Sequence, residues 1–347
     1  MIESFNIKNF RGIKELSIGK LGRINIILGN NNSGKTSVLD AIMLFSGATN
    51  PRLAVTINWV RQYAKISDEM LHINFYDMNP ENRIVLSGRY NDSKERTLRI
   101  NYVEEETDSI SEENVSSDEK HLYLKFEADV CGKTYHTQLT YPGEQPDSAS
   151  ITFLKKSEYT EELVCHYLPS SESYNNNVKL FSELLLDKQE KAIIKSLREI
   201  EPDLKDIIVA NDNLYADLGQ ERRIPIQVLG DGIRKIISIL INIYKVRNGG
   251  ILLIDEIDNG LHYKSMPTLW KSILSMARKY DVQLFATTHN IDSLRALNHT
   301  LGESDYADMQ DQSFTYTLRK NPLGQMKAFM NEYSQFNHLI NIETEIR

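Results

Sequence analysis

Gly29-Asn30-Asn31-Asn32-Ser33-Gly34-Lys35-Thr36 is the stretch of this chain from which a fold class follows. It fits the pattern G-x4-G-K-[ST], and it lies between the apolar run Ile24 to Leu28 and a segment with helical apolar spacing from Val38 to Phe45. In such a strand–loop–helix unit the glycines let backbone N–H groups turn towards phosphate oxygens, and the helix presents its positive end to the same anion. The stretch therefore predicts a loop that binds nucleotide phosphates.

Within this loop each side chain type has a distinct role in phosphate chemistry. Lys35 places a positive charge at the β- and γ-phosphates, and the Thr36 hydroxyl can bind Mg²⁺. We assign the loop from Gly29 to Thr36 and the adjacent Ser37 to nucleotide binding. A glycine-rich turn without a ligand is the alternative reading, and the strand before and the helix after the loop disfavour it.

Two further apolar segments end in residues suited to phosphate transfer. The run Ile251 to Ile254 ends in Asp255 and Glu256, and the run Leu284 to Ala286 is followed by Thr287, Thr288 and His289. Downstream of a phosphate loop, Asp255 is expected to hold Mg²⁺, usually through water, and Glu256 to orient and polarise the attacking water. His289 is expected to sense the γ-phosphate, although a histidine at the end of a strand is often only structural.

A third segment, Leu229-Gly230-Asp231-Gly232-Ile233, opens a very apolar helix. Two glycines at the start of a helix can expose N–H groups to an anion. Alone the segment would be an ordinary junction between a loop and a helix. Its place shortly before Asp255 favours Gly230, Asp231 and Gly232 as a second nucleotide contact.

Composition limits the remaining function classes. The chain has 347 residues, a formal net charge of -8 and a pI of about 5.6, which argues against broad, sequence-independent binding to nucleic acid but allows a local basic groove. Its two cysteines, Cys131 and Cys165, form neither a disulfide framework nor a zinc site. No signal peptide and no membrane-spanning run is apparent, so we expect a cytoplasmic protein with no membrane contact.

The pattern of apolar and polar residues divides the chain into four parts. Alternating strands and helices in the final third predict an α/β head with a mainly parallel sheet. Short alternating segments between about 70 and 156, beginning with Leu71 to Phe75, predict an inserted antiparallel β lobe, and its acidic stretch Glu104 to Lys120 is expected to be a solvated, mobile loop. The expected parts are the first half of the head, the β lobe, a helical insertion and the second half of the head, at 1–60, 61–169, 170–210 and 211–347.

The order of phosphate loop, signature segment, acid pair and histidine resembles the ABC ATPase family, and in particular its RecF, SMC and OLD (overcoming-lysogenisation-defect) branch. The opening Phe5-Asn6-Ile7-Lys8-Asn9-Phe10-Arg11-Gly12-Ile13 is similar to the first strands of that branch. The resemblance covers roughly 1–50 and 205–300, and it adds Arg11 to the nucleotide contacts. Within the branch, the chain resembles the ATPase subunits of bacterial antiphage systems, including the PARIS type.

This resemblance implies that ATP and Mg²⁺ are sandwiched between two heads, in a head-to-head dimer or a higher oligomer. Lys35 and Glu256 of one subunit would face the segment from Gly230 to Gly232 of the other. Gly230 stands where the family has a serine, and His262 stands where it has an aspartate, so slow hydrolysis or a dimerisation switch is expected. Gln62 is only a weak candidate for the glutamine that senses Mg²⁺ in the family.

Three functions remain after this comparison. About 58 residues follow His289, too few for the nuclease domain of OLD proteins, so the leading hypothesis is a regulatory ATPase that controls a separate effector, such as a TOPRIM- or HNH-type nuclease, in response to a phage-derived trigger. The alternative is a RecF-like repair ATPase that binds DNA directly. A transporter cassette is disfavoured, because membrane-coupling motifs are absent.

Overall fold

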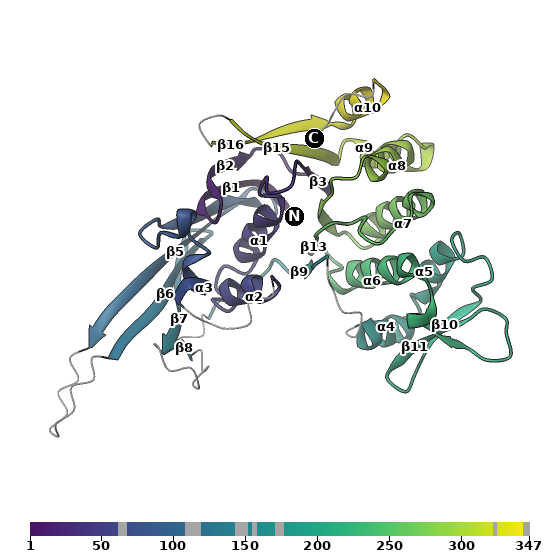
Figure 1. Ribbon diagram of the computed structural model, residues 1–347, viewed down its shortest axis with the longest axis horizontal. Coiled ribbons are helices and arrows are strands. Elements are labelled where there is room, and N and C mark those ends of the chain that lie inside the picture. The colour runs from purple at the N-terminus through teal and green to yellow at the C-terminus, as the bar shows by residue number, and fades with distance from the viewer. Residues whose placement is uncertain are drawn as a thin grey trace.

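The computed structural model describes residues 1–61, 68–107, 119–142, 152–154, 158–170, 177–321 and 325–342. Two β-sheets, here called sheet A and sheet B, lie on either side of helix α1 (Lys35–Ser46). A layer of helices covers the other side of sheet B (Figure 1). The expected α/β class, with a mainly parallel sheet and an antiparallel β lobe, is confirmed.

Sheet B carries the parallel strands of the head, and its strand order is β16-β15-β3-β14-β13-β9. The neighbouring pairs from β15 to β9 are parallel, and only β16 runs antiparallel to its neighbour. The strands are β3 (Ile24–Leu28), β9 (Cys165–Leu168), β13 (Ile251–Ile254), β14 (Gln283–Thr287), β15 (Ser313–Lys320) and β16 (Met326–Glu332). Because both faces of the central strands are covered, these strands read as continuous apolar runs.

Alternating residues of the central strands divide the interior into two cores. In β13, Leu252 and Ile254 pack against the helix layer, whereas Ile251 and Leu253 pack towards α1 and sheet A. This follows from the two-residue period of a strand, which sends successive side chains to opposite faces. The strand ends are therefore held from both sides.

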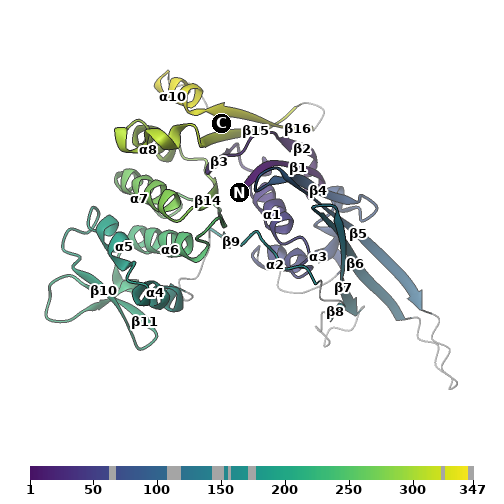
Figure 2. The same cartoon turned by 180° about the vertical axis from the view of Figure 1, so that it is seen from behind.

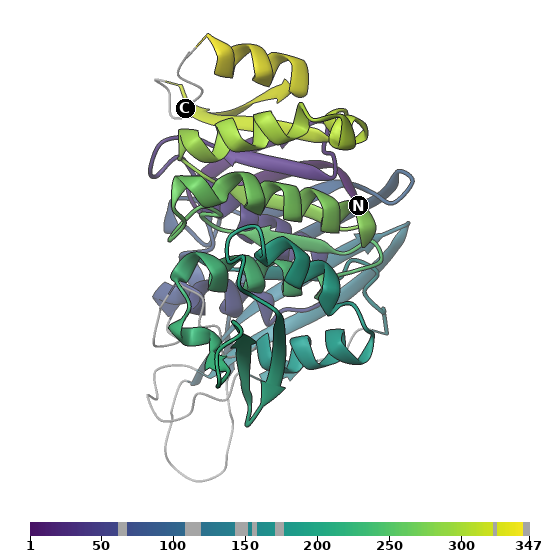
Figure 3. The ribbon, with the colours of Figure 1, turned by 90° about the vertical axis from the view of Figure 1, so that its right-hand side faces the viewer.

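The helix layer on the far side of sheet B contains the apolar helix α6, whose side chains are buried along most of its length. Figure 3 shows α6, α7 and α8 side by side across this face. The helices assigned to this half of the chain are α4 (Asn177–Leu186), α5 (Glu190–Leu197), α6 (Asp231–Lys245), α7 (Met266–Lys279), α8 (Ile291–Leu301), α9 (Ala307–Gln310) and α10 (Tyr333–Asn341). Among the described residues, no helix combines the length and apolar character that crossing a bilayer requires.

Sheet A is antiparallel, with the strand order β2-β1-β4-β5-β6-β7-β8 (Figure 2). Its strands are β1 (Ile2–Phe10), β2 (Ile13–Ile18), β4 (Ile84–Tyr90), β5 (Lys94–Thr107), β6 (Glu119–Val130), β7 (Lys133–Pro142) and β8 (Thr152–Leu154). The first hairpin, which was expected with the head, is hydrogen-bonded through β1 to β4 of the lobe. The lobe therefore continues the N-terminal hairpin.

Two local expectations differ from the structure. The strand expected at Leu71 to Phe75 is wrong: its first two residues end α3 (Asp68–His72), the next two form a turn, and only Phe75 forms a bridge, to Phe10. Met70 and Leu71 are both buried there, which a helix next to the core allows and an amphipathic strand does not. Both ends of the expected acidic loop lie in strands instead, because β5 continues to Thr107 and β6 begins at Glu119, and the rest of that stretch lies outside the described residues.

The sequence patterns did not predict the small third sheet, here called sheet C. Sheet C consists of β10 (Asp206–Ala210), β11 (Asn213–Asp217) and β12 (Ile224–Pro225) and lies beside α4 and α5. Helix α2 (Leu53–Trp59) contacts α1 and α3, and Gln62 lies outside the described residues.

Candidate nucleotide site

The candidate site lies at one edge of sheet B, where three parallel strands end. Strand β14 pairs with β3 on one side and with β13 on the other. Because parallel strands carry their carboxyl ends to the same edge, the segments that follow these strands meet there. They are the loop from Gly29, the acids Asp255 and Glu256, and the residues from Thr287 to His289.

The loop after β3 has a backbone that only glycine can adopt at two positions. Gly29 has φ 145° and Gly34 has φ 90°. A Cβ atom on Gly29 would lie 2.5 Å from Oγ of Ser33, and one on Gly34 would lie 2.8 Å from the end of Met326. Oγ of Ser33 is buried and has no hydrogen-bond partner among the described residues. A tight loop with an unsatisfied hydroxyl fits the oxygen-rich phosphates of a nucleotide.

Lys35, the first residue of α1, turns back over this loop. Its Nζ donates hydrogen bonds to the carbonyl oxygens of Gly29 at 2.8 Å and Asn30 at 3.0 Å. Burial lowers the pKa of Lys35, and the nearby charges of Asp255 and Glu256 act in the opposite direction. The ammonium is thus held at the mouth of the loop, with the acid pair close enough to act on its charge.

Thr36 and Asp255 meet directly, although 219 positions separate them in the chain. Oγ1 of Thr36 lies 3.2 Å from Oδ1 of Asp255. A hydroxyl and a carboxylate are oxygen ligands of the kind that Mg²⁺ uses, together with water and substrate phosphates. The donor set therefore fits the metal that the sequence predicts at these two residues.

Thr287, the last residue of β14, joins the two acids. Its Oγ1 donates to Oδ1 of Asp255 at 2.6 Å and accepts from the backbone N–H of Glu256 at 2.8 Å. The carbonyl of Thr287 also accepts from the N–H of Ile257 at 3.0 Å. Glu256 has φ 49°, a left-handed conformation that is unusual for a residue with a side chain, and these bonds hold its backbone in that conformation.

Sequence reasoning assigned no role to Thr287. The available signal was a hydroxyl at the end of a strand that is otherwise apolar and fully buried. A buried hydroxyl must find a hydrogen-bond partner, so its neighbours at the same sheet edge could have been inferred, but which acid it reaches depends on the strand order.

His289 follows Thr288 at the same edge, and its side chain is exposed. Oγ1 of Thr288 accepts from the N–H of Asn290 at 3.0 Å, and Oδ1 of Asn290 caps α8 by accepting from the N–H of Asp292 at 2.8 Å. The turn that carries His289 is therefore fixed between the end of β14 and the start of α8.

The segment from Gly230 to Gly232 begins α6 and lies on the opposite side of sheet B from α1 (Figure 1). A Cβ atom on Gly232 would lie 3.3 Å from Leu261, and one on Gly260 would lie 4.0 Å from Cβ of Asp231. The segment thus packs on the loop that follows Glu256. Within one chain, the fold does not bring this segment over the phosphate loop.

The surface around this segment is exposed and partly apolar. Gly230 and Asp231 are exposed, and Asp231 pairs with Arg234. His262 is exposed, and its Nδ1 accepts from the N–H of Lys264 at 3.3 Å. The large side chains of Val228 and Tyr263, next to these residues in the chain, are 71% and 58% exposed.

Arg11 lies in a buried cluster of charges on the other flank of α1. Its guanidinium lies 2.9 Å from Oδ2 of Asp40 and donates to Oδ1 of Asn58 at 2.7 Å, and Nε of Arg61 donates to the same oxygen of Asp40 at 3.1 Å. Burial raises the pKa of Asp40, while the two guanidinium groups oppose that rise. Asp40 lies one helical turn after Thr36, so the cluster supports the start of α1, and a contact of Arg11 with ATP stays a prediction.

Comparison with known proteins places this geometry in a family. A family model described as "AAA domain, putative AbiEii toxin, Type IV TA system" matches residues 24–295, which include the loop, the acid pair and His289. A 48-residue stretch of this chain is also 58% identical to part of an uncharacterised protein of Methanocaldococcus jannaschii, over 14% of this chain and 22% of that protein.

Two relatives and one solved structure match over most of their length. A Helicobacter pylori protein named ATP/GTP phosphatase is 23% identical over 337 residues, covering 88% of this chain and 90% of the relative. The DNA replication and repair protein RecF of Lactococcus lactis is 23% identical over 355 residues, covering 86% and 96%. The structure of an SMC head bound to the C-winged helix domain of ScpA has a TM-score of 0.51 at 12% identity, covers 95% of this chain and 98% of that one, and shows a shared fold.

The substitution Thr287→Val tests the bridge between the two acids. It keeps the shape of the side chain but removes both hydrogen bonds of Oγ1, one of them to a carboxylate, which is worth about 1.5–3 kcal/mol. We expect ATP turnover to fall by about ten- to a hundredfold, because each 1.4 kcal/mol of lost positioning is about tenfold in rate. Steady-state phosphate release measures this.

Thr300→Val is the matched control, because it removes another buried threonine hydroxyl, one that donates within α8 to the carbonyl of Ala296 and lies away from the two acids. Equal turnover in the two variants would refute the role of Thr287 in positioning the two acids.

Proposed function

This chain belongs to the AAA domain family whose model it matches and is an ABC-type ATPase of the RecF/SMC branch, and on that premise we propose that it hydrolyses ATP to control a partner effector in antiphage defence. ATP and Mg²⁺ would bind at the loop from Gly29 to Thr36 and at Ser37. Backbone N–H groups of the loop would surround the phosphates.

The observation that carries the ATPase proposal is the contact between Thr36 and Asp255 beside the buried ammonium of Lys35. Thr36 and Asp255 would hold Mg²⁺, and Lys35 would neutralise charge on the β- and γ-phosphates. Glu256 would orient the attacking water, and His289 would sense the γ-phosphate. The bonds of Thr287 would keep Asp255 and Glu256 in register for both tasks.

We further propose that two copies close over ATP. The segment from Gly230 to Gly232 starts α6 on the far side of sheet B, and its exposed N–H groups suit an anion supplied by another chain. The exposed side chains of Val228 and Tyr263 would be buried in that assembly. Gly230 offers no hydroxyl to the γ-phosphate, so the closed pair would hydrolyse ATP slowly.

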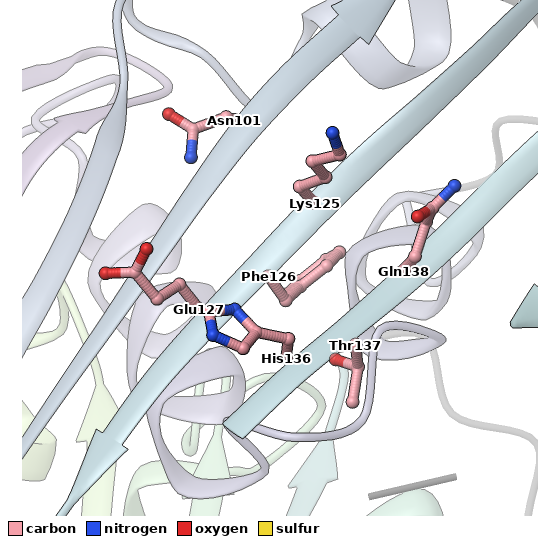
Figure 4. Close-up of a pocket in the computed structure, with 7 residues that line it drawn as sticks. All are labelled: Asn101, Lys125, Phe126, Glu127, His136, Thr137 and Gln138. Atoms are coloured by element: carbon pink, nitrogen blue, oxygen red, sulfur yellow. The ribbon is translucent and has the colours of Figure 1, made fainter. Parts of the chain in front are cut away.

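The trigger or the effector would contact the outer face of sheet A. The β lobe that forms most of this sheet lies outside the segments that resemble the family. A hollow of about 620 Å³ opens there over β5, β6 and β7 (Figure 4). Its lining side chains are mostly polar and come from neighbouring strands: Asn101, Lys125, Phe126, Glu127, His136, Thr137 and Gln138. Glu127 is already paired with Arg99, at 2.9 Å. This mixed polar surface suits a protein partner.

A RecF-like repair ATPase that binds DNA is the second candidate. The similarity to RecF of Lactococcus lactis over 86% of this chain favours it, and the net charge of -8 opposes it. DNA binding that weakens steeply with salt in the presence of ATP would support this second function.

Lys35→Ala tests the nucleotide site. Removal of the ammonium from the β- and γ-phosphates should weaken binding of ATP with Mg²⁺ by about a hundredfold or more, because a lost charge-assisted contact of about 3 kcal/mol corresponds to that factor. Titration calorimetry measures the affinity, and Lys14→Ala, at an exposed lysine on β2, is the control. Undiminished affinity of Lys35→Ala would refute the assignment of the loop.

Glu256→Gln tests the two-copy arrangement. The amide keeps the geometry but cannot act as a base, so turnover should fall strongly while ATP binding persists and the closed pair accumulates. Cysteines at the exposed positions Asn31 and Asp231, in a protein with Cys131→Ser, should then crosslink between chains with ATP and much less with ADP. Burial raises the pKa of Cys165, which disfavours its reactive thiolate, and the Cys131→Ser protein without the two new cysteines is the control for crosslinks through this thiol. Crosslinking that is independent of nucleotide would contradict closure by ATP.

Phage plating tests the defence role. Cells that carry this gene with its operon partner should resist phage, whereas cells with either gene alone, or with Lys35→Ala or Glu256→Gln, should not. The pure protein should lack nuclease activity. Full protection by this gene alone, or metal-dependent DNA cleavage by the pure protein, would overturn the two-component proposal.

A further inference from the structure

Arg96 of β5 reaches from sheet A to the end of the phosphate-loop helix. Its Nη1 donates hydrogen bonds to the carbonyl oxygens of Phe45 at 3.0 Å and Ser46 at 2.9 Å, the last two residues of α1. The side chain is almost completely buried, with 1% exposure. The last carbonyl groups of a helix lack partners within the helix and carry its negative end, so a guanidinium there satisfies both their hydrogen bonds and their charge.

The guanidinium is held from the other side as well. Its Nη2 donates to the hydroxyl of Tyr159 at 2.9 Å and to Oε1 of Glu161 at 2.7 Å. The group also lies over the ring of Tyr90, 4.7 Å from its centroid. A buried charge is tolerated only with such compensation, and loss of one partner is costly. The contact that Arg96 makes between β5 and the end of α1, here called the Arg96 contact, is therefore rigid.

The Arg96 contact lies at the opposite end of α1 from the nucleotide site and can influence that site through the helix. Helix α1 begins at Lys35 and ends at Ser46, so one end carries the phosphate loop and the other end carries Arg96. A helix of this length spans about 18 Å and transmits a shift of one end to the other. On β5, Arg96, Leu98 and Ile100 face the core, whereas Asn101 lines the outer hollow.

We propose that Arg96 is a positioning residue that couples the outer face of sheet A to the phosphate loop. The inference rests on the proposed ATP site and deepens it, because it names the route by which a partner on the lobe changes that site. A partner that shifts β5 shifts the end of α1, and with it Lys35 and Thr36. Coupling of this kind is reciprocal, so nucleotide at the loop must in turn act on β5, and we expect it to stabilise this strand.

Hydrogen exchange followed by mass spectrometry tests this reciprocity in the full-length Glu256→Gln protein, which keeps ATP in place. Addition of ATP with Mg²⁺ should slow amide exchange in peptides from β5 and β6 by about fivefold or more, the lower range of allosteric coupling. Arg96→Lys in the same protein should abolish this slowing, because a lysine keeps the charge but cannot reach two carbonyls and a carboxylate together. Its exchange near the phosphate loop should still respond to ATP.

Lys94→Gln is the matched control. Lys94 lies two residues before Arg96 on the same strand and pairs with Glu162, next to Glu161, at 3.0 Å, but both side chains of that pair are about half exposed. This variant should behave like the parent protein. Glu161→Gln is a second variant that leaves Arg96 in place and should reduce the response of β5, and it decides the question if Arg96→Lys does not fold.

The outcomes separate this inference from the proposed function. If the parent protein does not bind ATP, the proposed function fails. If it binds ATP and the slowing in β5 is the same in Arg96→Lys and Glu161→Gln as in the parent, or is absent from all, the coupling through Arg96 is refuted. Loss of the slowing in Lys94→Gln as well would show a general effect of charge on the lobe and would also refute it.

Discussion

The parallel pairing of β14 between β3 and β13 is the constraint on which the site depends. It places the hydroxyl of Thr287 within 2.6 Å of Asp255, which in turn lies 3.2 Å from Thr36 at the start of α1. Three segments that are far apart in the chain thus share one carboxylate. A change in the order of these strands would leave each motif intact and separate their side chains.

Helix α1 is the second organising element, because it is buried between the two sheets. The helix carries Lys35 and Thr36 at one end, Asp40 in the middle and the carbonyls held by Arg96 at the other. Asp40 lies against the guanidinium groups of Arg11, which follows β1, and Arg61, which follows α2, and Arg96 comes from sheet A, so cations from outside the helix support it along its length. Buried charges of this kind are stable only when each finds a partner, which ties the position of the helix to that of the lobe.

The opposite placement of α1 and α6 keeps the phosphate loop and the segment from Gly230 apart within one chain. The phosphate loop lies on one side of sheet B and the segment from Gly230 on the other. Both are exposed at their tips, and both suit an anion. In the proposed pair of copies the two segments would meet without any change of fold, and ATP would form part of the interface.

The sequence by itself determined the local units and their chemistry. The glycine loop, the apolar runs that end at Asp255 and Thr287, and the helix from Asp231 were all predictable, because backbone conformation and burial on two faces leave direct marks in the sequence. Membership of the ABC-type branch followed from the order of these units. The residues 71–75 were misread, since a short buried segment has no period that separates strand from helix.

Only the tertiary structure decided which of these units touch. Thr287, Asp40 and Arg96 are ordinary polar residues in the sequence, and each gains its role from a partner on another element. The joining of the N-terminal hairpin to the lobe in sheet A, and the addition of β15 and β16 at one edge of sheet B, likewise depend on long-range pairing. Hydrogen bonds between distant strands carry no local signature, because any extended segment offers the same backbone groups.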